Sequence, residues 1–151
     1  MYYTGVRTRY GWTRPSPEQI ALEVFGPSGV GPTGYSAARA LGLTTQIPVA
    51  PGLAVTHRIR TAVAGVKTSS RTNRLRHGLR YEEIAVLELL RNDEWRSVVD
   101  AGWPALVDAA ACAVEAGRIR PAALSACAHG ERSLALRANL SRLLATLRSG
   151  P

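Results

Sequence analysis

Hydrophobic and polar positions along the chain follow a helical period first, a strand period in the middle and a helical period again in the second half. At residues 16–19, Ser-Pro-Glu-Gln predicts a helix start, because serine suits the N-cap, proline suits the first helical position and glutamine completes a capping box. Apolar residues follow at helical spacing until Gly26 and Gly29 end the pattern. The apolar stripe comprises Ile20, Ala21, Val24 and Phe25.

A helix-to-strand junction is predicted at residues 34–48. Thr33 suits the N-cap of a helix that runs through Leu41, and Gly42 suits the left-handed residue that closes it. From residue 53 the pattern alternates with the period of a strand, which predicts one apolar face and one cationic face. The first face holds Leu53, Val55, His57, Ile59, Thr61 and Val63, and the second holds Thr56, Arg58 and Arg60.

A tight turn is predicted at residues 63–66, because Gly65 can supply the positive φ that a two-residue hairpin loop needs. The returning strand, residues 66–71, places Lys67, Ser69 and Arg71 on one face. In register, that face adjoins Arg58 and Arg60, so the hairpin of residues 53–71 would carry a ladder of cations. Like charges at this spacing destabilise a sheet, and a negatively charged partner would relieve that cost. The ladder is therefore a site hypothesis.

The second half of the chain is predicted to be helical. A basic loop at residues 72–80 leads into a helix from Tyr81, in which Ile84, Leu87 and Leu90 form the core stripe. Further helices are expected from Trp103-Pro104 to Gly117, from Pro121, and from about Glu131. The glutamates Glu82, Glu83 and Glu88 are expected to face water, and the last core stripe comprises Leu136, Leu140, Leu143, Leu144 and Leu147.

These elements predict an α+β fold with one N-terminal helix, a small central sheet carrying the basic hairpin, and a helical half that covers one sheet face and leaves the other exposed. A length of 151 residues with 46% hydrophobic residues fits a single domain. No apolar run approaches the roughly 20 residues that span a bilayer, and the N-terminus lacks the layout of a signal peptide. We expect a cytoplasmic protein that has no membrane partner.

Charge is concentrated in the middle of the chain. The formal net charge is +8, and no Asp or Glu lies between Glu23 and Glu82. A cationic region of this kind predicts contacts to nucleic-acid phosphates, although it would also serve as a solvated face that keeps the protein soluble. The predicted nucleic-acid-binding residues are Arg58, Arg60, Lys67, Arg71, Arg74, Arg76 and Arg80.

Catalytic, metal and cofactor chemistry has little support in the sequence. The glycine-rich stretch of residues 29–34 lacks the lysine of a phosphate-binding loop, so a short strand and turn are expected there. His57 has no Asp, Glu or Cys beside it. Cys112 and Cys127 lie in alanine-rich helical sequence without metal-ligand spacing, and we expect both to be small buried hydrophobes. No catalytic residue, metal or cofactor is predicted.

Three stretches carry a resemblance to a known family. Residues 41–48 (Leu-Gly-Leu-Thr-Thr-Gln-Ile-Pro), the strands that end near Ser70-Arg71, and the helix of residues 81–91 resemble the C-terminal domain of the AbiEi-like antitoxins of bacterial type IV toxin-antitoxin systems. The resemblance implies an antitoxin domain at residues 15–151. Residues 1–14 would be the remnant of a winged-helix wing with its linker, or else a solvated N-terminal tail.

The resemblance implies a non-enzymatic antitoxin of a phage-defence system that counteracts a nucleotidyltransferase-like toxin. Direct contact with the toxin is left open, and the basic face would assist DNA binding and transcriptional autoregulation. DNA is the first expected partner, with RNA as the second. Two alternatives stay open, namely a small nuclease-like enzyme and a stand-alone nucleic-acid-binding transcriptional regulator.

Overall fold

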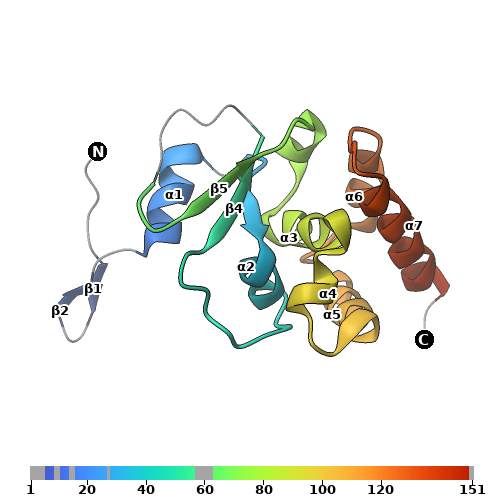
Figure 1. The fold of residues 1–151 in the computed structure, drawn as a ribbon, viewed down its shortest axis with the longest axis horizontal. Helices are drawn as coiled ribbons and strands as arrows, with labels where there is room; N and C mark the ends of the chain where they lie inside the picture. The colour runs from blue at the N-terminus through green and yellow to red at the C-terminus, as the bar shows by residue number, and fades with distance from the viewer. Residues whose placement is uncertain (1–5, 9–10, 14–15, 27, 57–62, 150–151) are drawn as a thin grey trace.

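The computed structural model describes residues 6–8, 11–13, 16–26, 28–56 and 63–149, and Figure 1 shows the arrangement of their elements. The prediction of an α+β fold with a small sheet and a helical C-terminal half is confirmed. The elements in chain order are β1 (Val6–Thr8), β2 (Gly11–Thr13), α1 (Pro17–Phe25), β3 (Gly31–Thr33), α2 (Gly34–Ala40), β4 (Gly52–Val55), β5 (Lys67–Ser70), the short 3-10 helix η1 (Arg74–Gly78), α3 (Tyr81–Leu90), the 3-10 turn η2 (Arg91–Asp93), α4 (Trp95–Val98), α5 (Gly102–Glu115), α6 (Pro121–Ala128) and α7 (Leu134–Ser149).

The three-stranded sheet has the order β3-β4-β5, with β3 antiparallel to β4 and β4 parallel to β5. The predicted hairpin of residues 53–71 is therefore wrong. A turn does form at Gly65, whose φ is 80°, and it lies directly before β5. Residues 57–62 of the predicted hairpin lie outside the described residues. Parallel strands need a connection that returns the chain to the starting edge, and a local turn signal does not reveal such a return. β1 and β2 pair separately as an antiparallel two-stranded sheet.

Both faces of the sheet are covered, contrary to the prediction that one face is exposed. Leu53 and Val55 of β4 pack with Val30 and with Ala21 of α1. On the opposite face α3 approaches so closely that a Cβ atom on Gly31 would lie 2.4 Å from Ile84 Cβ. β4 is buried along its whole length, because it lies between two strands and between α1 and the other helices.

α3 is the central helix of the molecule. It packs against β3 and α2 on one side and against α7 on the other, and Figure 1 shows it between the sheet and the C-terminal helices. Every residue from Glu83 to Leu90 is consequently buried. The expectation that Glu83 and Glu88 face water is wrong, and Glu82 alone of the three glutamates stays partly exposed.

The predicted helix boundaries agree well with the structure where local capping decides them. The capping box at Ser16 is present, with Gln19 N donating to Ser16 Oγ over 3.2 Å. Gly42 closes α2 with a φ of 73°, although Thr33 makes no side-chain cap at its start. α7 begins after Ser133, whose Oγ accepts a 3.1 Å hydrogen bond from Leu136 N, and not at Glu131. Its predicted core residues Leu136, Leu140 and Leu143 are buried, and Leu144 and Leu147 pack partly buried against the same core.

Candidate functional site

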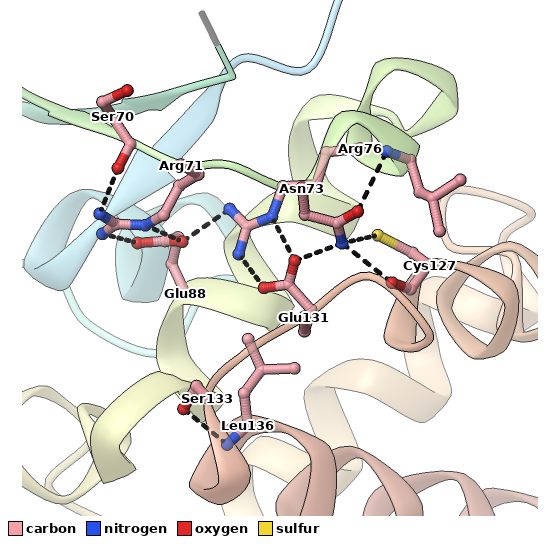
Figure 2. A network of polar contacts seen from close by, with 10 residues as sticks. Ser70, Arg71, Asn73, Arg76, Glu88, Cys127, Glu131, Ser133 and Leu136 are labelled. Atoms are coloured by element: carbon pink, nitrogen blue, oxygen red, sulfur yellow. Dashed lines mark hydrogen bonds and ion pairs between the residues drawn. The ribbon is translucent and has the colours of Figure 1, made fainter.

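The predicted basic residues separate into three groups in the structure. Arg58 and Arg60, together with His57, lie outside the described residues. Lys67, Arg74 and Arg80 are exposed. Arg71 and Arg76 point inward and belong to a chain of polar contacts between β5, η1, α3 and the turn before α7, which Figure 2 shows.

The centre of this arginine network is Arg76. Its Nη1 donates to Glu88 Oε2 over 2.7 Å, and its Nη2 donates to Glu131 Oε1 over 2.6 Å. Arg71 binds the other side of Glu88, with Nη2 at 2.7 Å from Oε1 and Nε at 3.1 Å from Oε2. Two guanidinium groups and two carboxylates therefore alternate along the network, and their charges cancel.

Asn73 extends the network to α6. Its Nδ2 donates to Glu131, to Cys127 O over 2.9 Å and to Cys127 Sγ over 3.3 Å, while Leu75 N donates to its Oδ1 over 3.1 Å. The side chain thus caps η1 and ties it to the end of α6. A Cβ atom on Gly130 would lie 2.0 Å from Asn73 Oδ1, so only glycine leaves room for this contact.

The burial of Arg76 corrects its predicted role. The side chain is 0% exposed and both its carboxylate partners are buried, so it cannot reach a phosphate at the surface. Arg71 is 17% exposed and already bound to Glu88. Removing one member of a buried ion pair leaves the other charge uncompensated, at a cost of about 3–5 kcal/mol. The two arginines therefore have a structural role. The charge pattern of the sequence did not reveal this, because it does not separate buried arginines from exposed ones.

Electrostatics within the network favour its charged state. Burial alone would raise the pKa of Glu88, but the guanidinium groups of Arg71 and Arg76 outweigh burial and hold that pKa below its usual range. For Arg76, burial opposes the charge, and the bonds to Glu131 and Glu88 overcome it and raise the pKa. Burial next to Glu131 raises the pKa of the Cys127 thiol to about 11. Cys127 is buried as predicted, whereas the exposed Cys112 contradicts the prediction.

A third buried carboxylate, Glu83, holds the start of α3 in place. Its Oε1 accepts hydrogen bonds of 2.7 Å from Arg80 N and from Arg120 Nη2, and its Oε2 accepts one of 2.7 Å from Arg120 N. Burial would raise the pKa of Glu83, but these bonds dominate and lower it. Arg80 also donates from Nη1 to Gly117 O over 2.7 Å, so its position at the surface is fixed.

Next to the arginine network the surface is hollowed by an open cavity of about 240 Å³. It lies between the end of β5, the segment before η1, the end of α3 and the start of α7. Arg91 and Arg132, which the sequence prediction missed, line it. The full lining is Ser70, Arg71, Thr72, Asn73, Arg91, Gly130, Glu131, Arg132 and Ser133. We call this feature the arginine hollow.

Two further hollows lie on the described surface. One of about 210 Å³ is adjacent to the arginine hollow, since Arg71 and Arg91 line both, and it adds Glu88 and Glu94 to its walls. The other, of about 300 Å³, lies between α1, α2 and the 47–51 segment, where Tyr81 Oη donates to Glu18 and Arg39 lies nearby. Burial raises the pKa of Glu18, with partial opposition from Arg39.

The described carboxylates do not assemble into a metal site. Among the described residues no group of three or more His, Cys, Asp or Glu side chains is placed to hold a metal ion. Glu83 and Glu88 instead accept hydrogen bonds from arginines on both carboxylate oxygens. With these carboxylates bound to arginines, exposed guanidinium groups remain available at the surface, and these groups suit the binding of anions.

Comparisons with family models, with curated proteins and with solved structures gave no match to this chain. Within the part of the chain that the structure describes, none of the helices has both the length and the apolar character needed to cross a membrane.

Proposed function

We propose that this protein is a non-enzymatic nucleic-acid-binding module that contacts phosphates through its surface cations, and that it acts in the cytoplasm as the antitoxin of a type IV toxin-antitoxin system. The observation that carries the binding proposal is the separation of buried from exposed arginines. Arg71 and Arg76 are neutralised inside the molecule. Lys67 and Arg74, by contrast, are exposed and have no carboxylate partner among the described residues.

The chemistry of the carboxylates favours binding over catalysis. A metal-dependent nuclease needs carboxylates that converge on a metal ion and are free to coordinate it. Here Glu88 and Glu131 hold Arg76, and Glu83 holds Arg120. Releasing any of them would leave a buried or partly buried guanidinium group without its partner, which is costly. These groups stabilise the fold and are not available for hydrolysis.

The antitoxin role rests on the resemblance of residues 41–48 and 81–91 to AbiEi-like antitoxins. In that role the surface cations would support promoter binding, or would compete with the toxin for an RNA or nucleotide substrate. Co-expression with a nucleotidyltransferase-like toxin of a type IV system tests the role. Rescue of growth supports it, and continued toxicity with soluble protein present contradicts it.

Titration of duplex DNA at a series of salt concentrations tests the binding proposal. The double variant Lys67→Gln with Arg74→Gln should bind more weakly at every sequence tested. It should also flatten the plot of log K against log salt by ~0.9 per lost phosphate contact. The control removes the same formal charge with Arg118→Gln and Arg148→Gln, two exposed arginines outside β5 and η1, of which Arg118 is paired with Glu82 over 2.7 Å. If both double variants weaken DNA binding equally, the binding depends only on the net charge of the protein, and the proposal is overturned.

A further inference from the structure

The arginine hollow combines positive charge and hydrogen-bond donors in a concave part of the surface. From these we propose that it is a binding site for a phosphate monoester, either the phosphate of a nucleotide or the terminal phosphate of a nucleic-acid strand. The inference deepens the proposed function and rests on it for the nucleic-acid source, while the hollow itself is distinct from Lys67 and Arg74.

The charge of the hollow matches a dianion. Arg71, Arg91 and Arg132 line it, and Arg76 lies behind its wall, where it binds Glu88 and Glu131. The lining itself sets three guanidinium groups against one carboxylate, Glu131, which leaves a net charge of +2. A phosphate monoester has a charge of about −2 at pH 7, because its second pKa is about 6, whereas a phosphodiester has a single negative charge. The hollow therefore suits a terminal phosphate better than a continuous backbone.

The two arginines that give this excess charge have no carboxylate partner of their own. Arg91 and Arg132 form no ion pair among the described residues, whereas Arg71 and Arg76 are both paired. Arg132 is exposed and Arg91 is half-buried, so both guanidinium groups can reach a ligand without breaking an existing bond. Planar guanidinium groups bind phosphate oxygens in pairs of hydrogen bonds, which adds geometric specificity.

Neutral donors complete the lining. Thr72 and Ser133 contribute hydroxyl groups, and Ser133 is also the residue from which the 16-residue helix α7 starts. The first N–H groups of a helix lack intrahelical acceptors and carry partial positive charge, so the start of α7 adds to the attraction for an anion. Hydroxyl and N–H donors around two guanidinium groups resemble the environments that bind phosphate in proteins generally.

The backbone after α3 holds Arg91 in place. Asn92 and Asp93 both have positive φ values, 52° and 55°, which non-glycine residues seldom adopt. Asn139 of α7 supports this turn, with its Nδ2 donating to Leu90 O over 3.1 Å and to Asp93 Oδ1 over 2.5 Å. Helix α7 therefore begins at one wall of the hollow. Through Asn139 it also supports the turn next to Arg91, which lines another wall.

Isothermal titration of the whole protein at low salt tests the site. The probes are inorganic phosphate, a nucleoside 5′-monophosphate, the same nucleoside without phosphate, and one single-stranded oligonucleotide with either a 5′-phosphate or a 5′-hydroxyl. Arg91→Gln with Arg132→Gln should weaken binding of the phosphorylated probes by roughly 10- to 100-fold, as expected for hydrogen bonds to a charged group. The control Arg118→Gln with Arg148→Gln should change it less than about twofold, because the lost charges lie elsewhere. Arg132→Gln alone, at an exposed position, provides a second variant if the double variant is unstable.

Preference for the phosphorylated strand over the monophosphate would identify a strand end as the ligand, and equal affinities would identify the nucleotide phosphate. Equal binding of the 5′-phosphate and 5′-hydroxyl strands, together with no binding of phosphate or monophosphate, would overturn the site even if duplex DNA still binds through Lys67 and Arg74. Conversely, monophosphate binding that depends on Arg91 and Arg132 would uphold the site even if the DNA titration contradicts the proposed function.

Discussion

Arg74 and Arg76 lie two residues apart in η1, and the structure gives them opposite surroundings. Arg76 is 0% exposed and donates to Glu88 and Glu131, whereas Arg74 is exposed and has no carboxylate partner among the described residues. In the sequence both belong to the same acid-free cationic region. The number of cations in a sequence region sets only the upper limit on the cations that the surface can present to a ligand. Burial in the folded protein decides which of those cations are accessible.

The distinction between arginines that are paired with carboxylates and arginines that are not also separates two regions around α3. On the inner side, Arg71 and Arg76 alternate with two glutamates and join three segments that are distant in the sequence, namely β5 with η1, α3, and the turn before α7. On the outer side, Arg91 and Arg132 line the arginine hollow without carboxylate partners among the described residues. Neutralised guanidinium groups hold the fold together, and unneutralised ones are available to a ligand.

The comparison is tested most strongly by replacing the two arginines of η1 separately. Arg76→Ala should lower the free energy of unfolding by about 3–5 kcal/mol, because it leaves Glu88 and Glu131 buried without their shared cation. Arg74→Ala should change it by less than about 0.5 kcal/mol, as expected at an exposed position. Chemical denaturation monitored by circular dichroism measures both. Equal effects of the two substitutions would show that burial does not separate these arginines.

Local signals predicted the helices well. Ser16 with Gln19, Gly42, Gly117 and Pro121 each act within one turn of the backbone, and each marks a helix end in the structure. The pairing of β4 with β5 could not be predicted in the same way, because β4 ends at Val55, well before the turn at Gly65, and the turn therefore does not set how the two strands pair. Direction depends on how the whole sheet packs against α1 and α3, which no local pattern records.

The candidate site was predicted only in part. The burial of Glu83 and Glu88 did have a signal, since residues 84–90 are apolar on almost all sides of the helix, which is typical of a central helix. Arg91 and Arg132 had no comparable signal. They come together because Asn139 fixes the turn after α3 and because α7 starts beside it. That juxtaposition is a property of the packed fold and not of either sequence segment.

Acid should weaken the inner region. The folded pKa of Glu88 lies below its unfolded value of about 4.5, so its ionised form contributes stability that is fully present above that value and is lost as pH falls through the folded pKa. Glu88→Gln should cost roughly 1.5–3 kcal/mol at neutral pH, as expected for losing charged hydrogen bonds. Below pH 4.5 the difference between the variant and the unmodified protein should shrink. Urea titrations at pH 7, 5 and 3.5 measure this, and a constant difference across that range would contradict the assignment.

Thiol labelling of the two cysteines provides the mildest test of the same comparison. Cys112 is exposed, whereas Cys127 is buried, accepts a hydrogen bond from Asn73 and has a pKa raised to about 11. The thiolate is the nucleophile that attacks a thiol-reactive reagent, so Cys127 should react slowly at pH 8. Cys112 should react promptly because it is exposed. Mass spectrometry of the Cys112→Ala protein isolates the reaction of Cys127.

Slow labelling of Cys127 should then report opening of the arginine network, because the thiol lies at its end. Arg76→Ala should accelerate that labelling, since it removes the cation that holds Glu131 against Asn73, and Arg74→Ala should leave the rate unchanged. If Cys127 reacts as fast as Cys112 in the folded protein, the network is open in solution. If Arg74→Ala accelerates labelling as much as Arg76→Ala does, then Arg74 also supports the inner region, and the contrast between the two arginines does not hold.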